Sequence, residues 1–86
     1  MHKGRNIIGP RMREARLLEK PKATQKDISA RLELDGIYLS ESSIGKIELC
    51  IRPVTDIQLV AIAKVLKTSA AWLLGETNDL YTTSKL

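Results

Sequence analysis

The stretch that decides the fold is residues 24–49, which read TQKDISARLELDGIYLSESSIGKIEL. Its first part is typical of a short helix, because Ile28 and Leu32 stand four residues apart and would share an inner face. Thr24 can cap this helix with its hydroxyl oxygen. We therefore expect a helix of about two turns, from Gln25 to about Leu32.

The second part of this stretch predicts another short helix, which begins after Ser40 and runs through Leu49. Ser40 can cap it, and Ile44 and Ile47 would face inward while small polar residues stay on the open side. Residues 33–39, between the two helices, are less regular and contain turn-forming residues. Two short helices in this order are typical of a helix-turn-helix, in which the first crosses the DNA backbone and the second enters the major groove.

Three further helices are expected outside this stretch, at residues 8–19, from a cap at Thr55 to about Leu66, and at residues 70–74. Pro21 ends the first of them. The helix after Thr55 has the clearest signal, because its apolar residues recur at the spacing of a buried stripe. The stripe consists of Leu59, Ile62, Ala63 and Leu66. Since no strand-length alternation is evident, the sequence predicts an all-α fold of five helices.

The length and composition of the chain indicate one domain. Its 86 residues support a single compact core, and 43% apolar residues without a low-complexity tract are typical of a chain that folds by itself. We expect the domain to span residues 8–75, with a flexible basic arm at residues 1–7. Residues 76–86 are expected to be a C-terminal tail that frays or contacts a second copy.

The positive charge is concentrated in the first third of the chain. Residues 1–26 hold eight lysines and arginines against two acidic residues, whereas residues 27–86 hold six against eight. This distribution suits contact with a polyanion, of which a phosphate backbone is the commonest. The alternative is a solvated basic face with no ligand.

Several classes of protein are disfavoured by what the sequence lacks. Cys50 is the only cysteine, and no run of apolar residues has the length of a signal peptide or a membrane span. We therefore expect a cytoplasmic protein. One histidine, no glycine-rich phosphate loop and no convincing carboxylate pair argue against an enzyme and give no reason to expect a cofactor, a metal or a small-molecule substrate. Scattered aromatics make RNA binding a weaker alternative.

Four motifs in this order resemble the Cro and phage-repressor type of helix-turn-helix, the XRE-like family, over Ile8 to Gly75. They are IGPRMREAR at 8–16, TQKDI at 24–28, SESSIGKIE at 40–48, and LVAIAKVL at 59–66 followed by WLLG at 72–75. The resemblance implies a five-helix lambda-repressor-like domain with a helix-turn-helix formed by its second and third helices. It also implies a sequence-specific regulator of transcription, a repressor that reads a double-stranded DNA operator. An antitoxin or protein-interaction module of the same fold is the alternative, with a partner protein such as a toxin.

The resemblance also places the residues that would contact DNA. It implies that Glu41, Ser42 and Lys46 read bases, with Lys46 donating to guanine and Glu41 accepting from cytosine unless it points outward as a repelled acid. Gln25 would bond a phosphate and brace the reading helix. Including charged residues that can meet phosphates, the expected backbone contacts are Gln25, Ser40, Ser43, Arg11, Arg13, Lys26 and Arg52. Arg16 and Glu48 are implied to form a partly buried structural ion pair.

The sequence departs from the family pattern mainly in three places. The connection from Leu32 to Ser40 is about five residues longer than usual, and Pro21-Lys22 lengthens the preceding turn. Cys50 stands where the family commonly has glycine, so either its backbone is left-handed and strained or the loop takes another path.

A homodimer is expected, because one short helix contacts too few base pairs to be selective. The candidate interface is apolar and lies in the fifth helix and the tail, although Trp72 could instead belong to the core. It consists of Trp72, Leu74, Leu80 and Tyr81.

Overall fold

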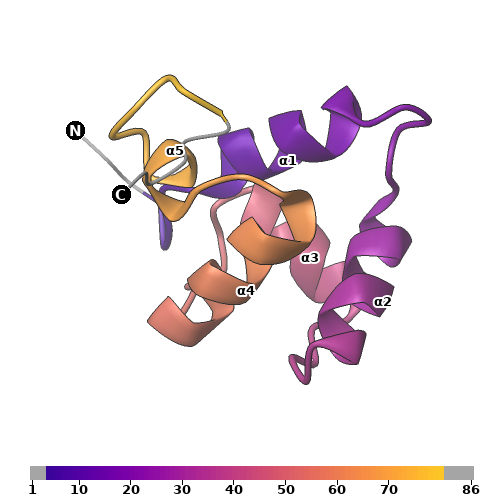
Figure 1. Ribbon diagram of the computed structural model, residues 1–86. Helices are drawn as coiled ribbons and strands as arrows, with labels where there is room; N and C mark the ends of the chain where they lie inside the picture. The colour runs from indigo at the N-terminus through magenta and orange to yellow at the C-terminus, as the bar shows by residue number, and fades with distance from the viewer. Residues whose placement is uncertain (1–3, 81–86) are drawn as a thin grey trace.

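Five helices make up the regular structure of residues 4–80, the part of the chain that the computed structural model describes, and no strand occurs there (Figure 1). They are α1 (Gly9–Leu18), α2 (Gln25–Leu34), α3 (Glu41–Glu48), α4 (Asp56–Leu66) and α5 (Ala70–Leu73). The predicted all-α fold is confirmed, and each helix lies within about two residues of its expected bounds. None of these helices is long and apolar enough to cross a bilayer.

Four helices begin with a hydroxyl cap of the kind the sequence predicts. In each case the hydroxyl oxygen accepts a hydrogen bond from the backbone N–H three residues later, which satisfies one of the free donors of the first turn. The caps are Thr24 on α2, Ser40 on α3, Thr55 on α4 and Ser69 on α5. These bonds explain why the predicted starts of the helices are accurate.

The same four helices end with a residue in the left-handed conformation. At each end, the N–H of the left-handed residue and the N–H of the residue after it donate to carbonyls of the last helical turn, which is the Schellman arrangement. The left-handed residues are Gly36, Cys50, Lys67 and Gly75, with φ of 83°, 64°, 59° and 81°. The first and last are glycines, which adopt this conformation freely, whereas Cys50 and Lys67 carry the strain of a side chain there. Of the two expectations for Cys50, the left-handed backbone is the one found.

We expect Lys67→Gly to raise the free energy of unfolding by about 0.5–1 kcal/mol, because the strain of a left-handed lysine exceeds the extra chain entropy of glycine. Lys67 is exposed, so little packing is lost. The control Lys64→Gly removes a lysine with ordinary helical backbone from the last turn of the same helix, together with its exposed ion pair to Asp35, and should lower stability by about 1–2 kcal/mol. Urea denaturation followed by circular dichroism measures both, and a loss of stability in Lys67→Gly would contradict the prediction.

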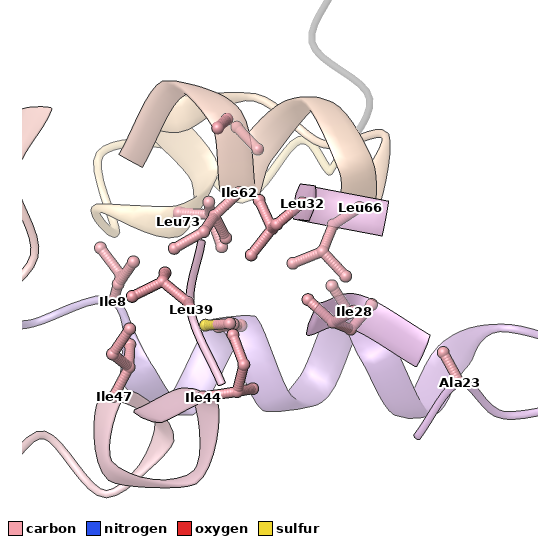
Figure 2. Close-up of a cluster of buried hydrophobic side chains, with 14 of the residues drawn as sticks. Ile8, Ala23, Ile28, Leu32, Leu39, Ile44, Ile47, Ile62, Leu66 and Leu73 are labelled. Atoms are coloured by element: carbon pink, nitrogen blue, oxygen red, sulfur yellow. The ribbon is translucent and has the colours of Figure 1, made fainter. Parts of the chain in front are cut away.

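The core is aliphatic and draws on every helix. Its largest fully buried side chains are Met12, Ile28, Leu32, Ile44, Ile47, Ile62 and Leu73. α2 packs against α3 and α4, and α1 packs against α3, α4 and α5. Figure 2 shows Ile44 and Ile47 of α3 in this cluster together with Ile62 of α4. The inner side of α3 is therefore fixed by packing, and its opposite side is left open.

The connection between α2 and α3 is shorter than the sequence predicts. α2 continues to Leu34, two residues beyond its expected end, because Gly36 supplies the left-handed turn that stops it. The side chain of Leu39 is buried, and the Ser29 hydroxyl donates to the Leu39 carbonyl at 2.6 Å. Lys64 Nζ reaches Asp35 Oδ1 at 3.0 Å. The connection is thus anchored to α2, α4 and the core just before α3 begins.

Residues 4–7, expected to belong to a flexible arm, form hydrogen bonds to the rest of the domain. Arg5 N–H donates to the Cys50 carbonyl at 2.7 Å, and Asn6 Nδ2 donates to the carbonyls of Ile47 and Arg52 at 3.1 and 2.8 Å. Asn6 Oδ1 in turn accepts from the N–H groups of Ile8 and Gly9 at the start of α1. This segment joins the start of α1 to the end of α3. Residues 1–3 and 81–86, with Tyr81, lie outside the described residues.

Candidate nucleic-acid interface

A shallow hollow on the outer side of α3 brings together residues from three helices. Its lining consists of Arg13, Gln25, Ser42, Gly45, Lys46, Glu48 and Leu49. Ser42 and Lys46, expected to read bases, therefore lie beside Arg13 of α1 and Gln25 of α2, expected to meet the backbone. Ser42, Lys46 and Arg13 are exposed.

A buried ion pair holds α3 in place below this hollow. Arg16 Nε donates to Glu48 Oε2 at 2.7 Å and Arg16 Nη2 to Oε1 at 2.9 Å, so the pair that the resemblance implied is present and bidentate. The side chains are only 10% and 3% exposed. Arg16 Nη1 also donates to the Ala23 carbonyl at 3.0 Å. The hydrogen bond to Glu48 raises the pKa of Arg16, so the guanidinium stays charged although it is buried.

Gln25 connects the start of α2 to the end of α3. Its Nε2 donates to Glu48 Oε1 at 3.1 Å, so Glu48 accepts hydrogen bonds from both α1 and α2. A Cβ built on Gly45 would lie 3.4 Å from Gln25 Oε1, so this amide also lies against the backbone of α3. The expected bracing of α3 by Gln25 is present, and its bond to a phosphate remains a prediction.

A second set of polar residues lies at the start of α3. The Ser43 N–H donates to Ser40 Oγ at 3.1 Å, and the Ser40 hydroxyl donates to Ser43 Oγ at 3.0 Å. Arg52 Nη1 donates to the Ser43 hydroxyl at 3.0 Å, which brings the loop after α3 back to its first turn. The structure thus joins Ser40, Ser43 and Arg52, all three of which the sequence assigns to the DNA backbone.

Several basic residues that the sequence assigns to DNA have no acidic partner. Within residues 4–80, none of Arg13, Lys26, Lys46 and Arg52 forms an ion pair. Lys26 is exposed in the first turn of α2. Of the acidic residues, Glu48 is neutralised by Arg16, while Glu41 is exposed in the first turn of α3. The unpaired cations are available to a polyanion.

Arg11 does not belong to this surface, and its expected contact with the DNA backbone is replaced by a structural role. Its Nη1 donates to the carbonyls of Trp72 and Thr77 at 2.9 and 2.6 Å, and its Nη2 donates to Asn78 Oδ1 at 2.8 Å. The guanidinium carbon lies 4.8 Å from the centre of the Trp72 ring. These contacts hold residues 77 and 78 against α1, so this part of the tail is not frayed.

Trp72 and its neighbours are used mainly within the chain. Trp72 is 4% exposed, and Leu74 and Leu80 are partly buried against the core. Of the two readings of Trp72, core packing is the one found, and the expected dimer surface in α5 and the tail loses its largest member.

Two residues that line or support this surface are not among those expected from the sequence. Leu49 lines the hollow and is 72% exposed, and a large aliphatic residue directly after a helix of polar residues was the signal for it. Asn6 ties the start of α1 to the end of α3, and an Asn just before a helix that lacks its own hydroxyl cap was the signal there.

No family model, curated protein or solved structure matches this chain. Among residues 4–80, no three His, Cys, Asp or Glu side chains gather as metal ligands would.

Proposed function

We propose that the chain is a sequence-specific, double-stranded DNA-binding regulator of transcription, a repressor, in which α2 and α3 form a lambda-repressor-like helix-turn-helix. The observation that carries the proposal is the outer side of α3, where Ser42 and Lys46 are exposed beside Arg13 and Gln25. An α-helix fits the major groove, and donors on its open side can reach the base edges. α3 is held by its inner side, so it can enter the groove without repacking.

Each group on this side has a role in the proposed complex. Lys46 donates to guanine N7 and O6, and Ser42 bonds a neighbouring base edge. Leu49 adds an apolar contact, which suits a thymine methyl group. Arg13 contacts the phosphates of the DNA backbone. Lys26 does the same from the first turn of α2, where the positive end of the helix dipole also attracts phosphate.

Glu41 restricts where α3 can bind. A carboxylate close to phosphates is unfavourable unless it accepts a hydrogen bond, which a cytosine amino group can donate. Glu41 therefore either reads cytosine or lies away from the bases. Two copies of the chain would read two half-sites about one helical turn apart, which supplies the selectivity that one eight-residue helix lacks.

Selection of duplexes from a random pool, followed by titrations with the selected sequence, tests this proposal. We expect Lys46→Ala to lose about 1–3 kcal/mol of discrimination at one base pair. Arg13→Ala should weaken binding to all sequences alike and reduce the slope of log affinity against log salt by about one unit. Anisotropy titrations at three salt concentrations measure both effects.

The matched control is Lys20→Ala. Lys20 lines a separate hollow with Val65 and Lys67, so its loss should leave the sequence preference unchanged and affect the salt slope less than Arg13→Ala does. Binding that is absent, or that does not depend on salt, would refute the proposed function.

A further inference from the structure

The outer face of α4 exposes two apolar side chains. Ile57 is 68% and Val60 is 64% exposed, and they stand three residues apart, one above the other on the helix. The buried stripe of the same helix, with Ile62 and Leu66, lies on the other side. Single exposed apolar residues are ordinary, whereas neighbouring ones mark a contact surface when they continue into further apolar surface.

This face does continue beyond Ile57 and Val60. Asp56, Ile57 and Val60 line one shallow hollow, and Asp56 also borders a second one between α4, α5 and the N-terminal segment. The apolar lining of the second hollow includes Ile7, Val54, Leu59 and Leu74. Ile7 is 48% exposed, so the apolar surface extends from α4 to the segment before α1.

Two charged residues flank Val60 at equal spacing. Asp56 precedes it by four residues and Lys64 follows it by four, and both are exposed on the same face of α4. If a second α4 packs antiparallel with the two-fold axis at Val60, each Asp56 meets the other Lys64, and the two Val60 side chains meet at the axis. The two helix dipoles are then also antiparallel, which is favourable.

We infer that the α4 face is where a second copy of this chain docks, in an antiparallel α4 pair centred on Val60. The charge pattern identifies the occupant, because a surface with opposite charges at equal distances from its centre is complementary to itself, as a two-fold interface must be. Lys64 already bonds Asp35, but its side chain is 70% exposed and can turn to the partner's Asp56. This inference extends the proposed function, since two copies supply two α3 helices, but the association itself can be measured without DNA.

A charge exchange provides the sharpest test. Asp56→Lys chains alone, and Lys64→Asp chains alone, place like charges opposite one another twice in each dimer. An equimolar mixture restores both opposite-charge pairs in the heterodimer. By sedimentation equilibrium we expect each variant alone to have a dimer dissociation constant at least about tenfold above that of the unaltered chain, and the mixture to recover most of the loss.

A symmetric crosslink tests the position of the axis. In a Cys50→Ser background, Val60→Cys places two thiols at the two-fold axis, where mild oxidation should join most of the chains into covalent dimers. The matched control is Leu34→Cys in the same background, because Leu34 is 91% exposed on α2 and lines neither of the two hollows of the α4 face. Equal crosslinking of both variants would overturn the proposed axis.

Placing a charge at Val60 or at Leu34 tests which of the two surfaces the dimer buries. Val60→Asp should raise the dissociation constant at least about tenfold while Leu34→Asp leaves it unchanged, with circular dichroism showing that both still fold. A chain that stays monomeric at roughly 100 μM, or whose α4 face is covered only by a different protein, would overturn the inference. A monomer that still binds DNA in a salt-dependent way would leave the proposed function standing, whereas an α4 dimer without DNA binding would refute that function alone.

Discussion

Gly9→Ala should destabilise the protein by about 3 kcal/mol, at the upper end of the cost of overpacking, although alanine is normally the better helix former. A Cβ built on Gly9 would collide with the Ile47 carbonyl oxygen and would lie 2.7 Å from the Glu48 carbonyl oxygen and 2.8 Å from Cys50 Sγ. Two of these atoms belong to the backbone of α3, so α1 would have to move away from α3. The approach brings the positive start of α1 to the negative end of α3, an arrangement that a side chain would disrupt.

The matched control is Gly45→Ala, which places the same methyl group in the middle of α3. The nearest atom to that Cβ would be Gln25 Oε1 at 3.4 Å, an ordinary contact, so we expect a gain of about 0.5–1 kcal/mol. Thermal unfolding should separate the two variants clearly, since a loss of about 3 kcal/mol lowers the melting temperature by roughly 12–24 °C in a domain of this size. Changes of the same sign in both variants would contradict the close approach of α1 and α3.

What the sequence predicts well is local. Thr24, Ser40 and Thr55 identify the starts of three helices because each cap bonds an N–H only three residues away. The stripe after Thr55 identifies the inner side of α4 for the same reason, since neighbours on one helix face are set by spacing alone. The apolar residues Ile57 and Val60 fall outside this stripe, and their exposure agrees with that.

What the sequence misses depends on contacts between distant residues. Arg11 was assigned to DNA from its charge, but its partners in the fold are at least 61 residues away. The arm at residues 4–7 was expected to be flexible, but Asn6 bonds carbonyls at the end of α3 and beyond it. The pair of Arg16 and Glu48 spans 32 residues, and only the family resemblance indicated it. Charge and spacing give no information on such partners before the helices are packed.

Glu48→Ala should lower the free energy of unfolding by about 3–5 kcal/mol, because it leaves the guanidinium of Arg16 buried without its counter-ion. The same change removes the acceptor of Gln25 Nε2, so α3 loses its polar contact with α2 as well as with α1. Urea denaturation measures the loss, and the proposed DNA-binding surface should be disturbed along with the position of α3.

The matched control is Glu19→Ala, because Glu19 also forms a bidentate pair, here with Nη1 and Nη2 of Arg31 at 2.8 and 2.7 Å. Those side chains are 28% and 36% exposed, so water screens the pair and its loss should cost about 0–1 kcal/mol. Equal losses in Glu48→Ala and Glu19→Ala would show that burial does not strengthen the inner pair.

The double variant Arg16→Met with Glu48→Leu separates stability from positioning. Apolar replacements of similar volume leave no charge unpaired, so we expect most of the 3–5 kcal/mol to be recovered, roughly to within 1 kcal/mol of the unaltered chain. Gln25 would still lack its acceptor, and α3 would be held by packing and by the hydrogen bonds that Asn6 donates to the carbonyls of Ile47 and Arg52. If the ion pair positions α3 for DNA, this variant should fold normally and yet bind its selected duplex more weakly. Unchanged affinity in a normally folded double variant would limit the role of Glu48 to stability.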